Sequence, residues 1–184
     1  GLIKKTGLAV IASTFLLAAP IIQADGHVKP AVVYDTAGKN DKSFNEAVFN
    51  GITKFMNDTG IAVTELEPTN EAMMEQSLKK FAQRGYSPVV AVGFTMANAV
   101  AAAAAEYPDT QFTIIDMVVD LPNVQSVIYK EHEGSFLVGI MAAMASNSGT
   151  VGFVGGMDIP LISRFECGYK QGVAHADSSM NVLA

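Results

Sequence analysis

The chain is poor in cysteine and in positive charge, and both shortages restrict what it can be. Its 184 residues include one cysteine, Cys167, which cannot form an intramolecular disulfide, so a hydrophobic core has to stabilise the fold. The 12 Lys and Arg residues stand against 18 Asp and Glu residues, which gives a net charge of −6. A nucleic-acid partner would need a basic surface to neutralise its phosphates. The composition therefore argues against a nucleic acid as partner.

A long hydrophobic run is also missing. The most apolar stretch, residues 8–19, follows Lys4 and Lys5 and is shorter than the roughly 20 residues that a membrane-spanning helix requires. This pattern is typical of a secretory signal, and Ala24 offers a cleavage site, so we predict a signal peptide over residues 1–24. Because no cysteine lies at the predicted cut, we expect no covalent lipid anchor and a soluble, secreted protein in the periplasm.

After residue 30, short apolar runs alternate with segments of helical periodicity. The first run is apolar throughout, which is typical of a strand buried on both faces of a parallel sheet. The predicted strands are residues 31–34, 61–66, 88–92, 111–115, 124–129, 150–154 and 181–183. The predicted helices are residues 43–59, 70–84, 94–106, 133–146 and 161–176. This order predicts an α/β fold with a doubly wound parallel sheet and right-handed crossovers.

The strand and helix pattern starts again after Lys130 and stops at Ala184, where a strand has begun. A sheet that stops at this point is not expected to be a finished domain. We therefore predict an N-terminal α/β lobe over residues 25–130 and a truncated second α/β lobe over residues 131–184.

Carboxylate and aromatic residues follow the ends of three predicted strands. Asp35 follows the first strand, Gly93 and Phe94 follow the third, and Asp116 follows the fourth. The carboxyl ends of parallel strands lie along one edge of the sheet, where α/β proteins bind ligands. Phe44 opens the helix after Asp35 and is expected at the same edge, although it could instead pack beneath the loop with Asp35 as a turn residue. Two rings and two carboxylates suit a planar ligand that carries hydroxyl groups.

Catalytic and metal-binding arrangements are not evident. Lys42 is adjacent to Ser43, but Ser43 is better explained, like Asp41, as a cap of the following helix. Residues 131–133 (Glu-His-Glu) point in different directions and have no second cluster, so no metal site is expected there. The glycine-rich residues 152–156 lack the dinucleotide fingerprint spacing and a basic residue for phosphates, so no cofactor is expected.

Several motifs together resemble the basic-membrane-protein (BMP) family. They are Asp41-Lys42-Ser43-Phe44-Asn45, Ile115-Asp116 ahead of Leu121-Pro122-Asn123-Val124, Glu133-Gly134-Ser135-Phe136-Leu137, and residues 151–160 with Arg164-Phe165-Glu166. The resemblance extends in order over essentially all of the chain after the predicted signal peptide. It implies an extracytoplasmic substrate-binding protein of an ABC importer with a type I periplasmic-binding-protein fold. ABC permease subunits would be its partners, and the family includes receptors for purine nucleosides.

The resemblance also implies roles for individual residues. Phe44 would stack on the nucleobase, and Asp116 would accept hydrogen bonds from the ribose hydroxyls. Asp35 and Asn45 would hydrogen-bond the ligand from the loop that contains the first motif. The other residues expected in the cleft are Phe94, Gly155 and Gly156.

Other ligands and one other class of protein stay open as alternatives. Within the binding class, another planar molecule with a polyol, such as riboflavin, could take the place of the nucleoside. From a different class, an α/β enzyme acting on a nucleoside would need a nucleophile and base, or a cofactor loop, and the sequence shows neither. One departure from the family is the absence of the cysteine that many members carry at the cut site for lipid attachment.

Overall fold

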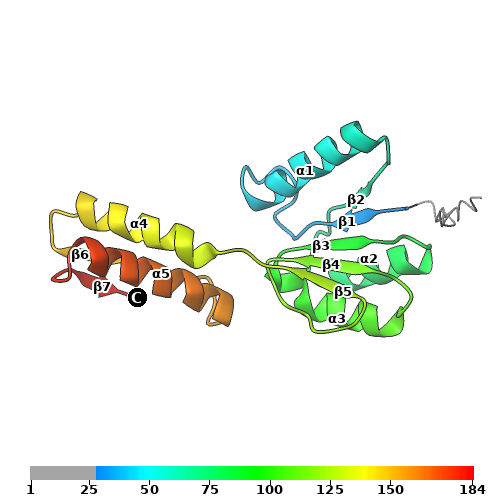
Figure 1. Ribbon diagram of the computed structural model, residues 1–184. Coiled ribbons are helices and arrows are strands. Elements are labelled where there is room, and N and C mark those ends of the chain that lie inside the picture. The colour runs from blue at the N-terminus through cyan, green and yellow to red at the C-terminus, as the bar shows by residue number, and fades with distance from the viewer. Residues whose placement is uncertain (1–27) are drawn as a thin grey trace, which may run out of the picture.

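Five short strands form one parallel sheet in the first part of the chain (Figure 1). This computed structural model describes residues 28–184, so the predicted signal peptide lies outside the described residues. Each neighbouring pair of strands is parallel, as the sequence predicted. The strands, in the spatial order β2-β1-β3-β4-β5, are β1 (Ala31–Val33), β2 (Thr64–Leu66), β3 (Val89–Val92), β4 (Phe112–Ile115) and β5 (Val124–Val127).

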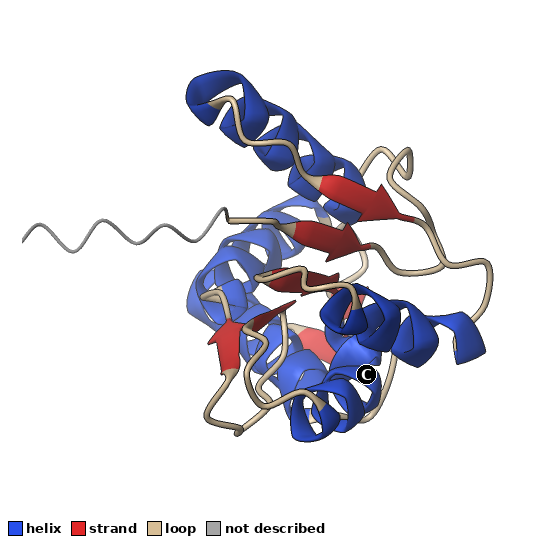
Figure 2. Cartoon of the chain, turned by 90° about the vertical axis from the view of Figure 1, so that its right-hand side faces the viewer, coloured by secondary structure: helices blue, strands red, loops and turns tan. Residues whose placement is uncertain are grey.

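Helices cover both faces of this sheet (Figures 1 and 2). They are α1 (Phe44–Thr59), α2 (Ala72–Gln83) and α3 (Ala97–Glu106), which follows the 3₁₀ turn η1 (Phe94–Met96). Val33 of β1 is buried in one cluster with Leu78 of α2 and Val100 of α3. The preceding residue, Val32, is buried on the opposite face with Ile52 of α1. Burial on both faces explains why this strand is apolar throughout.

Two of the predicted signals lie at helix ends, although α2 begins at Ala72 rather than at residue 70. Gly60 ends α1 in the left-handed conformation (φ 72°) and donates its backbone N–H to the carbonyl of Met56 at 2.9 Å. Asn70 Oδ1 accepts a hydrogen bond from the backbone N–H of Met73 at 3.1 Å, in the first turn of α2. Strand β2 is shorter than predicted, because only residues 64–66 pair with β1.

A buried asparagine joins the end of α3 to the start of β5. Asn123 is 6% exposed. Its side-chain nitrogen lies 3.1, 3.1 and 3.0 Å from the carbonyl oxygens of Ala104, Tyr107 and Thr110. These carbonyls belong to the last turn of α3 and the loop after it, where intrahelical partners are lacking. The predicted turn at residues 121–123 therefore also closes the end of a helix.

The rest of the chain forms a smaller α/β unit with its own sheet. Its elements are α4 (Glu131–Ala145), β6 (Thr150–Gly152), α5 (Pro160–Ala176) and β7 (Asn181–Leu183). Strands β6 and β7 pair in parallel as a separate two-stranded sheet. Helix α4 begins at Glu131 rather than at residue 133, where the sequence predicted its start. We refer to residues 28–130 as the first lobe and to residues 131–184 as the second lobe (Figure 1).

Helices α4 and α5 lie side by side and touch through their backbones (Figure 1). A Cβ atom on Gly139 would lie 2.1 Å from the carbonyl oxygen of Tyr169. A Cβ atom on Gly172 would lie 1.9 Å from the carbonyl oxygen of Phe136. Real Cβ atoms do not approach this closely, so only glycine permits this helix pairing. In the part of the chain that the structure describes, no helix is both long and apolar enough to cross a bilayer.

We predict that Gly172→Ala destabilises the protein while Gly51→Ala does not. The new methyl group at residue 172 meets backbone that cannot rotate away, so overpacking should cost about 1–3 kcal/mol of unfolding free energy. Gly51 lies on the exposed side of α1 with nothing within 4 Å of its Cβ position, so alanine should stabilise by about 0.5–1 kcal/mol. Urea unfolding followed by circular dichroism measures both, and equal stabilisation by both variants would contradict the close helix contact.

Candidate ligand-binding site

A cleft of about 870 Å³ lies between the two lobes. This volume is within the range of about 300–1,000 Å³ that is usual for small-molecule sites. The first lobe lines it with Phe44, Ala47, Val48 and Asp116. Tyr129 lies on the connection between the lobes, and the second lobe contributes Glu131, Gly134, Ser135, Val138, Gly152, Phe153, Val154, Phe165 and Tyr169. The lining is therefore mostly apolar and aromatic, with two carboxylates.

The ends of β1 and β3 come together at the edge of the sheet, as predicted. Asp35 Oδ1 accepts hydrogen bonds from Ala37 N at 2.8 Å and from Asn45 Nδ2 at 2.7 Å. Gly93 follows β3 with φ 99°, a conformation that favours glycine. A Cβ atom on Gly93 would lie 3.5 Å from Asp35 Oδ2 and 3.8 Å from Phe44 Cε1. Asp35 and Phe44 are therefore neighbours, with the Gly93 backbone against both.

Asp41 makes the hydrogen bonds that cap α1. Its carboxylate accepts bonds from the backbone N–H groups of Ser43 at 2.8 Å, Asn45 at 3.0 Å and Glu46 at 3.1 Å. Desolvation acts to raise the pKa of Asp41, but these backbone hydrogen bonds outweigh it and lower the pKa. Ser43, the other predicted cap, makes no side-chain capping bond. The cap determines where α1 begins, and so where Phe44 lies.

Asn45 is fully buried and connects the two carboxylates of this loop. Its Nδ2 donates to Asp35 Oδ1 at 2.7 Å and to Asp41 Oδ2 at 3.2 Å. Its Oδ1 has no hydrogen-bond partner among the described residues. In this arrangement Asn45 positions Asp35 relative to the start of α1, and neither Asn45 nor Asp35 lines the cleft itself.

Phe44 presents one side to the cleft and the other to the first lobe. It packs against the buried cluster of Val32, Tyr34, Ile52 and Val92, and it is only partly exposed. Its neighbours in the cleft, one helical turn along α1, are Ala47 and Val48. The ring is thus fixed by packing while part of its surface stays accessible to a ligand.

Asp116 follows β4 and lines the cleft from the same edge of the sheet. Its backbone is left-handed (φ 71°), a conformation that few residues other than glycine adopt, and its N–H donates to Val127 O at 2.7 Å. Burial raises the pKa of its carboxyl group, and the negative charge of Glu131 raises it further. The positive charge of Arg164 acts in the opposite direction. A carboxyl group that is partly desolvated beside a second one can accept hydrogen bonds strongly when ionised.

Glu131 is the main residue of the cleft that the sequence did not predict as a ligand contact. It forms an ion pair with Arg164 Nε, which links the first turn of α4 to α5. Ser135, one turn further along α4, donates its hydroxyl to the carbonyl of Phe165 at 2.6 Å. Extending the predicted helix back to residue 131 would have placed Glu131 and Ser135 on one face. Within residues 28–184, no group of three or more His, Cys, Asp or Glu side chains could hold a metal ion.

Besides Asp35 and Asn45, three further predicted residues lie outside the 870 Å³ cleft. Phe94 is half-buried in η1 and does not line it. Gly155 borders a separate hollow of about 240 Å³, and a Cβ atom there would lie 2.7 Å from the Ile162 side chain. Gly156 is exposed on the same loop. Of the predicted residues, the structure places Phe44 and Asp116 directly on the cleft, with Asp35 and Asn45 beside Phe44.

A family model and individual related proteins assign the chain to the same family. Residues 28–184 match the Bmp family, described as ABC transporter substrate-binding protein PnrA-like. The ABC transporter nucleoside-binding protein BmpA of Lactococcus lactis subsp. cremoris (strain MG1363) is 32% identical over 160 residues, 84% of this chain and 46% of BmpA. Basic membrane protein A of Borreliella burgdorferi is 28% identical over 147 residues, 78% of this chain and 43% of its own length. The chain thus spans about half the length of these relatives.

Solved structures agree with the sequence matches. An ABC transporter solute-binding protein from Aeropyrum pernix K1 has a TM-score of 0.75 and 30% identity, covering 85% of this chain and 46% of that one. A sugar transporter from Clostridium phytofermentans, 13% identical, has a TM-score of 0.64 over 85% of this chain and 60% of its own, which shows the fold alone. The chain therefore belongs to the Bmp family of PnrA-like ABC transporter substrate-binding proteins and has the type I periplasmic-binding-protein fold.

Proposed function

We propose that the chain acts in an ABC importer as an extracytoplasmic substrate-binding protein whose interlobe cleft binds a purine nucleoside. The observation that carries the proposal is the meeting of Phe44 and Asp116 in one cleft, an aromatic ring and a carboxylate on the same edge of a parallel sheet. The name of the Lactococcus lactis relative, a nucleoside-binding protein, supports this choice of ligand. The protein binds and releases its ligand unchanged, and it is not an enzyme.

The base is held by the aromatic side of the cleft. A purine stacks on Phe44, whose ring is already fixed by the first-lobe core. Tyr129, Phe153 and Phe165 line the same cleft and offer further aromatic surface. Stacking on aromatic side chains tolerates different bases, so these rings favour a flat ligand without choosing among purines.

The sugar is held by the carboxylate side of the cleft. Asp116 accepts hydrogen bonds from the ribose hydroxyls. Asp35 and Asn45 do not line the cleft, and they position the start of α1, and with it Phe44, beside the base. Charged acceptors make stronger hydrogen bonds than neutral ones, so a polyol attached to the planar ring increases affinity. Phe94, Gly155 and Gly156 lie off the cleft, and the proposal does not depend on them.

Membership of the family also supports a location and partners for the protein. Residues 1–24 act as a signal peptide, and the chain works in the periplasm with ABC permease subunits as partners. Residues 25–130 form one lobe, residues 131–184 belong to the second, and the two close on the ligand. Some relatives, such as one from Pyrococcus furiosus that is 32% identical over 154 residues, are named lipoproteins.

Removing the stacking ring tests the mode of binding. Phe44→Ala should weaken adenosine and guanosine binding roughly tenfold or more, because stacking of one base on an aromatic side chain is worth about 1–3 kcal/mol. Phe55→Ala is the matched control, since Phe55 is an exposed phenylalanine of the same helix that does not line the cleft. Isothermal titration calorimetry measures the dissociation constants of both variants.

The same titrations separate the alternative ligands. Unchanged affinity of Phe44→Ala would remove the stacking role. Riboflavin binding without nucleoside binding would replace the proposed ligand by another planar polyol. Consumption of the nucleoside during titration would point to an enzyme.

Acidification should weaken nucleoside binding at a higher pH than it would if Asp116 had the pKa of an exposed aspartate. Burial raises the pKa of Asp116, so its carboxylate gains a proton, and loses acceptor capacity, at a higher pH than an exposed aspartate. Affinity should therefore fall as the pH decreases from neutral towards about 4. Asp116→Asn should bind more weakly at neutral pH and show a flatter pH profile, because residue 116 no longer titrates. Dissociation constants across this pH range test the prediction, and identical profiles for both proteins would contradict it.

A further inference from the structure

Glu131 carries a carboxylate oxygen that the fold does not use. It is the first residue of α4, its side chain is 3% exposed, and it lines the cleft together with Asp116. One oxygen, Oε1, is paired with Arg164 Nε. The other, Oε2, is buried and has no hydrogen-bond partner among the described residues. A buried charged oxygen without a donor is costly, so its presence beside a cleft points to a donor that arrives with a ligand.

The charged side chains that line the cleft are all acidic among the described residues. Asp116 and Glu131 line it, and none of the described residues that line it is Lys, Arg or His. Arg164 compensates part of the negative charge, but its side chain is 41% exposed and lies outside the cleft lining, beside Asp116 in the small hollow next to it. Charges in a partly desolvated cleft interact over short distances more strongly than in water. A ligand with a negative group at this end is therefore disfavoured.

A purely structural role for Glu131 accounts for one of its carboxylate oxygens, Oε1, but not for Oε2. The ion pair with Arg164 joins the start of α4 to α5, and it engages Oε1. If this were the whole role, breaking the pair would change the affinity for all ligands of the cleft alike, whatever their charge. Oε2 is shielded from bulk solvent and Glu131 lines the cleft, so the remaining source of a donor is a molecule bound in that cleft.

We propose that Glu131 is a second specificity-determining residue of the cleft: with Asp116, it accepts hydrogen bonds from the sugar of the bound nucleoside and excludes nucleosides phosphorylated there. This inference rests on the proposed function and adds to it the charge class of the ligand. The two carboxylates come from different lobes, so a sugar held by both joins the end of β4 to the start of α4.

The test compares three ligands that differ at the 3′ position of the sugar, which is neutral, cationic or anionic. They are adenosine, 3′-amino-3′-deoxyadenosine, which is cationic at mildly acidic pH, and adenosine 3′-monophosphate. The native protein should bind the amino compound at least as tightly as adenosine and the phosphate at least about tenfold more weakly. Glu131→Gln should reduce the preference for the amino compound over the phosphate by about tenfold.

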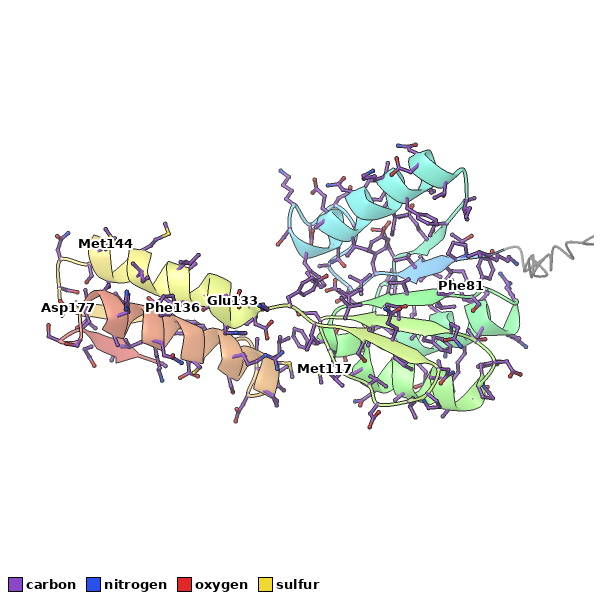
Figure 3. The ribbon with its side chains drawn as sticks, viewed as in Figure 1. Phe81, Met117, Glu133, Phe136, Met144 and Asp177 are labelled. Carbon is purple, nitrogen blue, oxygen red and sulfur yellow. The ribbon has the colours of Figure 1, made fainter. Side chains whose placement is uncertain are left out.

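Two matched variants separate a direct contact from a structural or long-range effect. Arg164→Gln breaks the same ion pair but keeps the carboxylate, so it should retain or strengthen the preference for the cation. Glu133→Gln removes a charge from an exposed residue at the start of α4 that pairs with Lys130 and does not line the cleft, so it should leave the preference unchanged (Figure 3).

Calorimetry of all four proteins decides the case. An unchanged preference in Glu131→Gln, or equal changes in Glu131→Gln and Arg164→Gln, would overturn the role of Glu131. If Glu131→Gln does not fold, the native protein still decides, because equal affinity for adenosine and its 3′-monophosphate would overturn the proposal. A native protein that binds no nucleoside refutes the proposed function, whereas nucleoside binding without discrimination by charge refutes only this inference.

Discussion

The hydrogen bonds of the buried Asn45 amide are the interaction on which the cleft depends. They connect Asp35, at the end of β1, to Asp41, which caps α1, and so determine the separation between a strand end and a helix start. The amide is fully buried and the two carboxylates are only partly exposed, so water competes less for these bonds than it would at the surface. Phe44 occupies the helix position just before Asn45, so the same bonds determine how its ring faces the cleft. A short polar network thus orients the apolar surface that a ligand would meet.

The second lobe forms the wall of the cleft opposite Phe44 and Asp116. The chain passes from β5 to α4 beside the cleft, and the crossing brings Glu131 close to Asp116, which follows the neighbouring strand. Aromatic rings and carboxylates consequently occupy the same cleft but come from both lobes. Met117, the residue after Asp116, lies at this junction with Leu161 of α5 (Figure 3). The proposed ligand contact, Asp116, is therefore adjacent in the chain to a residue at the junction between the lobes.

Local signals made much of the first lobe predictable. The polar loop before Phe44 and the glycine at residue 60 mark the ends of α1, and alternation of strands and helices predicts a parallel sheet whose edge gathers Asp35 and Phe44. Asp41 rather than Ser43 caps the helix because its carboxylate reaches three backbone N–H groups, a choice that depends on loop geometry. The burial of Glu131 and its pairing with Arg164 of α5 could not be predicted from sequence, since both arise only when two helices pack. Whether Phe94, Gly155 and Gly156 meet a ligand stays a prediction.

The glycine contacts between α4 and α5 have a mechanical consequence. Where two backbones touch, neither helix can slide or roll past the other without collision, so the pair has no soft internal degree of freedom. Phe165, whose carbonyl is bonded by Ser135, has to travel with α4. A rotation of the backbone at residues 128–130, between β5 and α4, would therefore move α4 and α5 together as one rigid pair. A small angular change there would displace all the cleft residues of these two helices at once.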